Sequence, residues 1–144
     1  MTHKELVKRA SLWLRNRKRC MVVLTELTTA ANNEIPDVLG FYYTGGSILI
    51  ECKASRADFL ADRNKIFRRC SEHGMGDQRF LFAESGLLSK DDLPSGWGLL
   101  ECEPHRVKQA VESGSFEANK KAEVIMLASV LRRLEISTAV FVRQ

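Results

Sequence analysis

The segment SILIECKA, residues 47–54, is the most informative part of the sequence because it joins an apolar, β-branched run to two charged residues. On a β-strand, residues two apart share a face, so Glu51 and Lys53 project together. The other face is then apolar and is formed by Ile48, Ile50 and Cys52. Because charges in a central strand are costly without partners, the pattern predicts a buried strand that carries a polar site.

The preceding strand is expected over residues 37–43 and begins directly after Pro36. Gly45-Gly46 between the two runs indicates a tight hairpin, which would bring Asp37 close to Glu51. Two carboxylates about 4 Å apart repel by about 4 kcal/mol at an effective dielectric near 20. Lys53 supplies one compensating charge, and a Mg²⁺ ion held by oxygen ligands and waters would supply the rest.

This set of groups suits hydrolysis of a phosphodiester. A divalent ion polarises the phosphoryl oxygen and acidifies a bound water, while the ammonium of Lys53 orients that water or neutralises developing charge. An ordinary salt-bridge cluster within the strand is the alternative that the residues leave open.

The remaining pattern predicts an α/β fold in the order α-β-β-β-α-β-β-α-β. Helical periodicity covers residues 3–19, 55–69 and 117–134, and the second of these helices has a capping-box-like start at Ser55. Residues 28–35 are expected to form a loop. Strand-like runs cover residues 21–27, 37–43, 47–54, 79–83, 97–101 and 137–142.

Composition favours one globular domain over residues 1–144, with 44% hydrophobic and 28% charged residues. It excludes disorder, collagen-like repeats and a multidomain enzyme. The net charge of +4 suits a polyanionic partner but is also common for a solvated surface. No apolar run approaches the roughly 20 residues of a membrane span, so we expect a cytoplasmic protein with no membrane partner.

Pro36-Asp37 together with Glu51-Cys52-Lys53 resembles the PD-(D/E)xK nuclease superfamily, whose shared core is a mixed sheet in α-β-β-β-α-β order. Over about residues 20–135, the chain is similar to MmcB-type DNA-repair nucleases and phage-associated relatives. The similar positions include Glu26, Pro36-Asp37, residues 51–59, Asp62, Lys65, Gly74-Met75-Gly76, Leu93-Pro94, and residues 97–100 and 119–133. The resemblance implies a restriction-endonuclease-like core and a metal-dependent DNA nuclease, acting in DNA repair or phage-related DNA processing.

The same resemblance implies roles for individual residues. Asp37 and Glu51 would bind Mg²⁺, for which Mn²⁺ can substitute, and the carbonyl of Cys52 would add a ligand. Lys53 would assist the attacking water. A further acid is expected, with Glu26 on the first strand preferred and Glu5 on the first helix as the alternative.

Cationic residues provide the predicted contacts with DNA. Ser55 and Arg56 start the helix that follows Lys53, so they are expected to contact a phosphate. Backbone contacts are also expected from Arg63, Lys65, Arg68 and Arg69. The basic side of the first helix is either a solvated face or a ridge that contacts phosphates. A homodimer or a protein partner would supply specificity.

Two other classes of protein remain open. The first is a non-catalytic nucleic-acid-binding module that retains the nuclease fold, against which the intact Asp37, Glu51 and Lys53 argue. The second is a zinc-stabilised structural domain, because two Cys-x-x-His pairs offer four ligands. These ligands would be Cys70, His73, Cys102 and His105, although the wide spacing favours ordinary reduced thiols.

Overall fold

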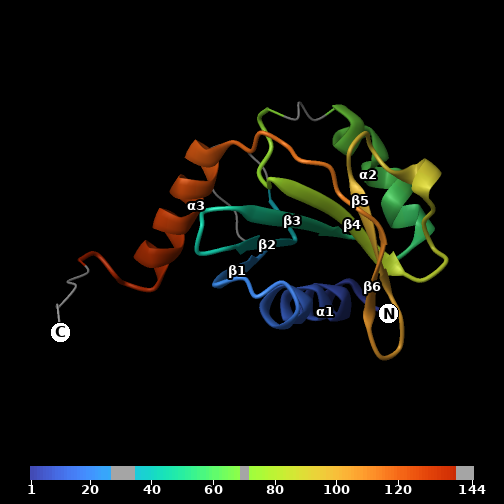
Figure 1. Ribbon diagram of the computed structural model, residues 1–144, viewed down its shortest axis with the longest axis horizontal. Coiled ribbons are helices and arrows are strands. Elements are labelled where there is room, and N and C mark those ends of the chain that lie inside the picture. Colours follow the sequence, from blue (N-terminus) through green and yellow to red (C-terminus); the bar gives the residue numbers. More distant parts are fainter. Residues whose placement is uncertain (27–34, 69–71, 139–144) are drawn as a thin grey trace.

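A six-stranded mixed sheet in the order β1-β2-β3-β4-β5-β6 forms the centre of the computed structural model (Figure 1). The structure describes residues 1–26, 35–68 and 72–138, with the backbone alone for 65–68. The helices are α1 (His3–Asn16), α2 (Arg56–Arg68) and α3 (Lys120–Arg133), and a 3-10 helix, η1, covers Lys90–Asp92. The strands are β1 (Val22–Thr25), β2 (Val38–Phe41), β3 (Ser47–Cys52), β4 (Gln78–Glu84), β5 (Gly98–Cys102) and β6 (Val107–Val111).

The sheet combines antiparallel and parallel pairs. Strands β1, β2 and β3 form an antiparallel meander, β3, β4 and β5 run parallel, and β6 returns antiparallel to β5. Helix α2 makes the crossover that parallel neighbours β3 and β4 require. The predicted mixed α/β architecture is therefore confirmed, including the order α-β-β-β-α-β from α1 to β4.

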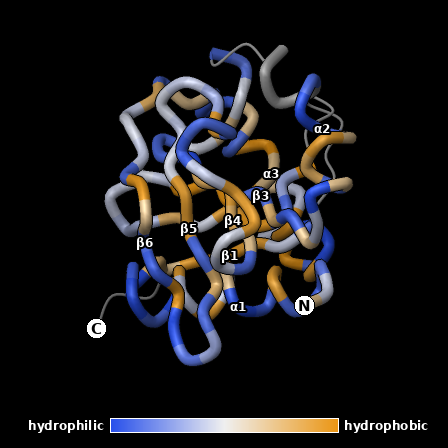
Figure 2. The backbone as a smooth tube through the Cα atoms, turned by 90° about the vertical axis from the view of Figure 1, so that its right-hand side faces the viewer, coloured by the Kyte–Doolittle hydropathy of each residue, from blue (hydrophilic) through white to orange (hydrophobic). Residues whose placement is uncertain are grey.

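Helices cover both faces of the sheet (Figure 1). Ile48, Ile50 and Cys52 pack with α1 residues such as Leu14 on one face. Leu49 lies on the other face, in a cluster that also holds Phe59 of α2 and Met126 of α3. The alternation predicted for residues 47–54 is correct, and Figure 2 shows apolar central strands beneath more hydrophilic outer segments.

Both tryptophans are core residues. Trp13 is 8% exposed and Trp97 is 6% exposed, on opposite faces of the sheet. Trp13 contacts the ring of Phe80 edge to face, with centroids 6.1 Å apart. Neither ring is exposed enough to act as a stacking platform for bases.

Two predicted elements end earlier than expected because a non-glycine residue takes a left-handed conformation. The predicted helix 3–19 ends at Asn16, and Arg19 beyond it has φ of 56°. The predicted strand 21–27 ends at Thr25, because Glu26 has φ of 48° and cannot continue an extended ladder. Glu26 therefore lies directly after β1 rather than within it.

The C-terminal half differs from the sequence prediction in two places. Strand β6 was not predicted, since its sequence VKQAV is short and does not alternate apolar and polar residues, as an edge strand with little burial permits. The strand predicted at 137–142 is absent at Ser137 and Thr138, and residues 139–142 lie outside the described residues. Within the described ranges, no helix combines the length and apolar character needed to cross a membrane.

Candidate functional site

The β2–β3 hairpin positions Asp37 at the C-terminal end of β3. Val38 pairs with Ile50, so Asp37, one residue earlier, lies level with Glu51. The carboxylate Oδ2 of Asp37 accepts a hydrogen bond of 2.7 Å from the backbone N–H of Cys52. This contact fixes one Asp37 oxygen against the strand, while its side chain stays 16% exposed.

An imidazole and two carboxylates converge beside this contact. His3 Nε2 lies 3.1 Å from Glu26 Oε1 and 3.4 Å from Asp37 Oδ1. One ligand atom from each residue lies within 4.8 Å of the others. We call His3, Glu26 and Asp37 the acid–histidine cluster. Its members come from the first turn of α1, the end of β1 and the start of β2.

The N-terminal cap of α1 explains how His3 reaches this position. Thr2 Oγ1 accepts the N–H of Glu5, and Glu5 Oε2 accepts the N–H of Thr2 at 2.7 Å, which together form a capping box. These hydrogen bonds to Thr2 lower the pKa of Glu5 below its ordinary value. Glu5 is thus used as a cap, and Glu26 is the acid that lies beside Asp37.

His3 was not among the residues predicted from the sequence. The motif Thr-x-x-Glu at residues 2–5 could have placed it in the first turn of a helix. Nothing local in the sequence indicates that this turn packs against the beginning of β2, because that contact depends on how α1 crosses the sheet.

Glu51 and Lys53 are both buried on the α2 side of β3. Glu51 is 7% exposed and Lys53 is 4% exposed. Lys53 Nζ donates a 2.9 Å hydrogen bond to Asp62 Oδ2, so the cation expected to balance Asp37 and Glu51 is bound by an acid of α2. Within the described part of the chain, Glu51 does not join the acid–histidine cluster.

The electrostatic environment of Cys52 links these charged groups. Burial raises the pKa of its thiol strongly, and the charges of Asp37, Glu51 and Glu26 raise it further, while Lys53 lowers it. All four charged side chains therefore act on the end of β3. The thiol itself packs in the apolar cluster beneath α1, so it stays protonated and unreactive.

The start of α2 is capped by its own residues. Ser55 Oγ accepts the N–H of Asp58 at 3.0 Å, as the capping pattern predicted. Asp58 Oδ2 in turn accepts the N–H of Ala54 at 3.1 Å. The cap directs α2 away from β3 immediately after Lys53, and one turn further Asp62 reaches back to the Lys53 ammonium.

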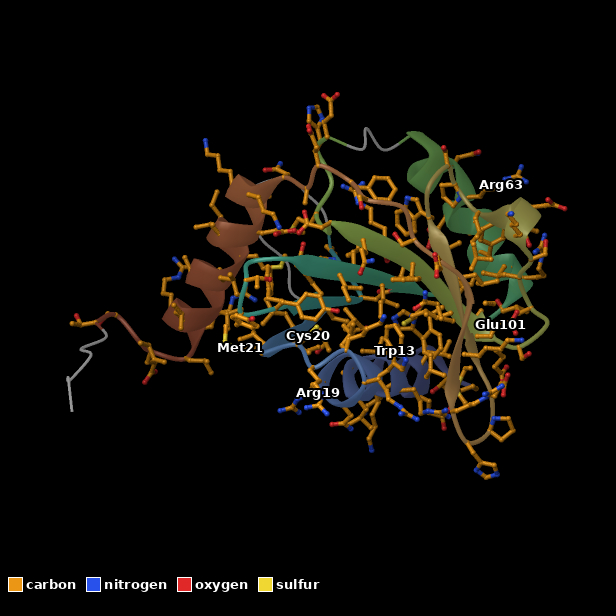
Figure 3. All side chains as sticks on the ribbon, viewed as in Figure 1. Trp13, Arg19, Cys20, Met21, Arg63 and Glu101 are labelled. Atoms are coloured by element: carbon orange, nitrogen blue, oxygen red, sulfur yellow. The ribbon has the colours of Figure 1, made fainter. Side chains whose placement is uncertain are left out.

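The predicted DNA-contacting residues differ in how they are placed. Arg56 binds Asp92 of η1 at 2.7 Å and stacks on Phe59, so its guanidinium already has protein partners. Arg63 is exposed on the outer side of α2 (Figure 3). The side chains of Lys65 and Arg68 are not described, and Arg69 lies outside the described residues.

The predicted zinc ligands do not form a site in the described residues. Cys102 ends β5 level with Glu84, the last residue of the parallel strand β4, whereas His73 precedes the start of β4. These two ligands therefore lie at opposite ends of the sheet. Cys70 lies outside the described residues, and the Cys102 thiol contacts the Met1 sulfur at 3.6 Å.

The donor set of the acid–histidine cluster fits a divalent cation. Mg²⁺ is commonly held by one or two carboxylates together with several waters, which Asp37 and Glu26 can provide. An imidazole such as that of His3 suits transition metals better than Mg²⁺. The side chain of Glu26 is 55% exposed, so an ion can approach from solvent.

No family model matches the chain, and no curated protein matches it. A similar fold occurs in the solved structure of the SPO1766 protein from Silicibacter pomeroyi, whose function is unknown. The TM-score is 0.67 at 21% sequence identity, and the match covers 99% of each chain. This likeness shows the fold alone.

Proposed function

We propose that this protein is a Mg²⁺-dependent deoxyribonuclease with a restriction-endonuclease-like core. The observation that carries the proposal is the pair of carboxylates, Asp37 and Glu26, within 4.8 Å of each other beside the Glu51-Cys52-Lys53 end of β3. The proposed nuclease would act in DNA repair or phage-related DNA processing, as the sequence resemblance implies.

Asp37 and Glu26 would hold the ion, and the resemblance adds Glu51 and the Cys52 carbonyl as ligands. When bound, Mg²⁺ would polarise a phosphoryl oxygen and lower the pKa of a bound water. The protein's own contribution begins with Asp37, whose carboxylate is fixed in one orientation by the Cys52 N–H. A carboxylate fixed in advance costs no ordering entropy when the cation arrives.

Lys53 supplies the fixed positive charge of the proposed site. Its ammonium is almost fully buried and is oriented by Asp62 at 2.9 Å. Charges interact more strongly in such a low-dielectric setting than in water. Lys53 can therefore stabilise the negative charge that develops on a phosphoryl group, and Asp62 is a positioning residue.

The backbone of Glu26 gives independent support. Its φ of 48° places a side chain with a Cβ in the left-handed region, which costs on the order of 1–2 kcal/mol. Strain of this kind is found preferentially at active sites and ligand clamps, where the surrounding structure maintains it. In this protein the strained residue carries one of the two clustered carboxylates.

A non-catalytic nucleic-acid-binding module is the second candidate. Two observations favour it: Lys53 already has Asp62 as a partner, and His3 lies between the carboxylates of Glu26 and Asp37. A protonated His3 would act as a cation there, so the cluster could be stable without metal.

Incubation of the purified protein with single-stranded, duplex, nicked and branched DNA separates the two candidates. We expect cleavage with Mg²⁺ or Mn²⁺ and none with EDTA. The variants Glu51→Gln and Lys53→Met should lose cleavage while still binding DNA in EDTA. Binding without cleavage of any substrate would assign the non-catalytic function, and cleavage in EDTA would disprove metal dependence.

A further inference from the structure

A groove of about 490 Å³ lies between α1 and the β5–β6 hairpin. Figure 1 shows these two elements side by side, although they are distant in the sequence. None of the residues that line the groove belongs to the acid–histidine cluster. We call it the basic groove, and its polar and aromatic lining includes Arg9, Trp13, Arg17, Lys18, His105 and Arg106.

The charge of the basic groove is strongly positive. Four of its lining residues are permanently cationic at neutral pH, and none of the described residues that line it is acidic. Glu103 compensates one of these charges, because its Oε2 accepts a 2.8 Å hydrogen bond from Arg106 Nε. One carboxylate therefore offsets one of four cations, and Arg9, Arg17 and Lys18 keep the groove positive.

Contacts within the protein hold the cationic side chains in place. Arg9 Nη2 donates a 2.9 Å hydrogen bond to the backbone carbonyl of Glu103, which connects α1 to the hairpin. Lys18 Nζ lies 5.2 Å from the centre of the Trp13 ring. Neither contact cancels a positive charge, so the groove presents cations that are already ordered before a ligand binds.

We infer that the basic groove binds the phosphate backbone of a nucleic-acid strand. Arg9 and Arg17 are separated by about 12 Å along the axis of α1. This distance is longer than a single phosphate group. Successive phosphates of a strand rise by about 3.4 Å along the axis of a duplex and lie farther apart along the strand itself, so the groove is long enough for more than one of them. The inference rests on the proposed function, because it supplies the DNA-holding surface that the acid–histidine cluster lacks.

Recognition in this groove is independent of base sequence. Trp13 is only 8% exposed and lies below Lys18, so it offers no ring on which a base could stack. Asn16 and His105 also line the groove, but most of its polar groups are ammonium and guanidinium groups, which position a phosphate backbone without reading bases. Of the basic residues of α1, Lys4, Lys8 and Arg15 do not line the groove.

The test compares two triple variants that each remove three positive charges. The groove variant is Arg9→Gln with Arg17→Gln and Lys18→Gln. The control is Lys4→Gln with Lys8→Gln and Arg15→Gln, all exposed and outside the groove. Affinity for a short fluorescent single strand and for its duplex is measured in EDTA across a salt series.

We expect the groove variant to bind at least about 10-fold more weakly than the control. The slope of log affinity against log salt should fall by about three, since each phosphate contact contributes about one. Equal weakening by both variants would overturn the inference. Displacement of the oligonucleotide by millimolar inorganic phosphate alone would also overturn it, by showing a site for a single anion.

A second groove variant, Arg17→Gln with Lys18→Gln, avoids the Arg9 contact with the hairpin and covers the case in which the triple variant misfolds. It should weaken binding and reduce the salt slope by about two; unchanged binding would refute the groove. Cleavage with Mg²⁺ is recorded in parallel. If the groove variants lose binding and the wild type cleaves no DNA, the groove is supported and the nuclease function is rejected. If the wild type cleaves DNA and the groove variants bind as well as the wild type, the nuclease function is supported and the groove is rejected.

Discussion

Strand β3 carries a polar cluster at each end, and the two clusters are built differently. At its start, Glu123 of α3 is 2% exposed and Ser47 is 1% exposed. Glu123 Oε2 accepts hydrogen bonds from Ser47 Oγ at 2.7 Å and from the Gly76 N–H at 2.8 Å. At its far end, the acid–histidine cluster brings carboxylates close to one another, and Glu26 is half exposed.

An anchoring acid and a ligand-binding acid differ in whether both carboxylate oxygens already have donors. Both oxygens of Glu123 have donors within the protein, since Lys120 binds Oε1 at 3.0 Å. Lys120 also binds Asp77 at 2.6 Å, so this cluster connects α3 to the sheet. A buried carboxylate whose oxygens already have donors within the protein has no capacity left for a metal ion. Adjacent, exposed carboxylates gain stability when a cation joins them.

The two clusters should differ most in their contribution to catalysis. Asp37→Asn should reduce Mg²⁺-dependent DNA cleavage on the order of 10³-fold, because it removes a charged metal ligand. The asparagine Oδ1 can still accept the Cys52 N–H, so the fold should remain intact. Initial rates of cleavage per folded molecule measure the effect.

Glu123→Gln is the matched control, since it makes the same change at the other end of β3. It should leave the rate per folded molecule within about threefold of the wild type. If Glu123→Gln lowers cleavage as much as Asp37→Asn, the functional distinction between the two clusters is wrong.

The next effect is on stability, for which the cluster around Glu123 should matter more than the acid–histidine cluster. Glu123→Ala removes the buried acceptor of the Ser47 hydroxyl and the Gly76 N–H, which should lower the free energy of unfolding by about 3 kcal/mol. For a chain of this size, the melting temperature should fall by about 10 °C. Asp37→Asn should change the free energy by less than about 1 kcal/mol, because its acceptor is kept. Urea denaturation of both variants checks the contrast.

Backbone strain at Glu26 gives a smaller effect. Glycine tolerates φ of 48° without a Cβ penalty, whereas alanine does not. Glu26→Gly should therefore be more stable than Glu26→Ala by about 1 kcal/mol, although both remove the carboxylate and should impair cleavage equally. Thermal unfolding compares the pair, and an alanine variant that is as stable as the glycine variant would argue against strain.

The smallest effect concerns pH. Burial lowers the pKa of Lys120, but its hydrogen bonds to Asp77 and Glu123 outweigh burial and raise the pKa above its ordinary value. Its contribution to stability is present below that value and is lost as pH rises through the raised pKa. Lys120→Gln should therefore lose less stability than the wild type between about pH 9 and 12. Because the side chain is 49% exposed, the difference should stay below about 1 kcal/mol.

The sequence predicted β3 and its neighbours well because their signals are local. The alternation in residues 47–54 and the Gly45-Gly46 turn specify two strands and their pairing, and the β2–β3 register follows. Those signals placed Asp37 level with Glu51. They did not reveal that Lys53 is bound by Asp62, since that contact depends on the direction in which α2 leaves the strand.

The long-range parts of both clusters could not be predicted. His3 reaches Asp37 through the packing of α1, and Glu123 reaches Ser47 through the packing of α3, each across a large sequence separation. The early ends of α1 and β1 depend on the left-handed residues Arg19 and Glu26, whose side chains do not favour that conformation. Tertiary contacts impose it.

The turn that joins β2 to β3 lies at the opposite end of the hairpin from Asp37, yet it sets where that carboxylate lies. Tyr42 N–H bonds to the Gly46 carbonyl at 2.8 Å, and Gly45 takes φ of 89° to close the loop. Inserting one residue there would shift the pairing by one position and rotate Asp37 to the opposite surface. The length of this distant loop therefore sets where Asp37 lies relative to Glu26. A change in that length would disable the pair without replacing either residue.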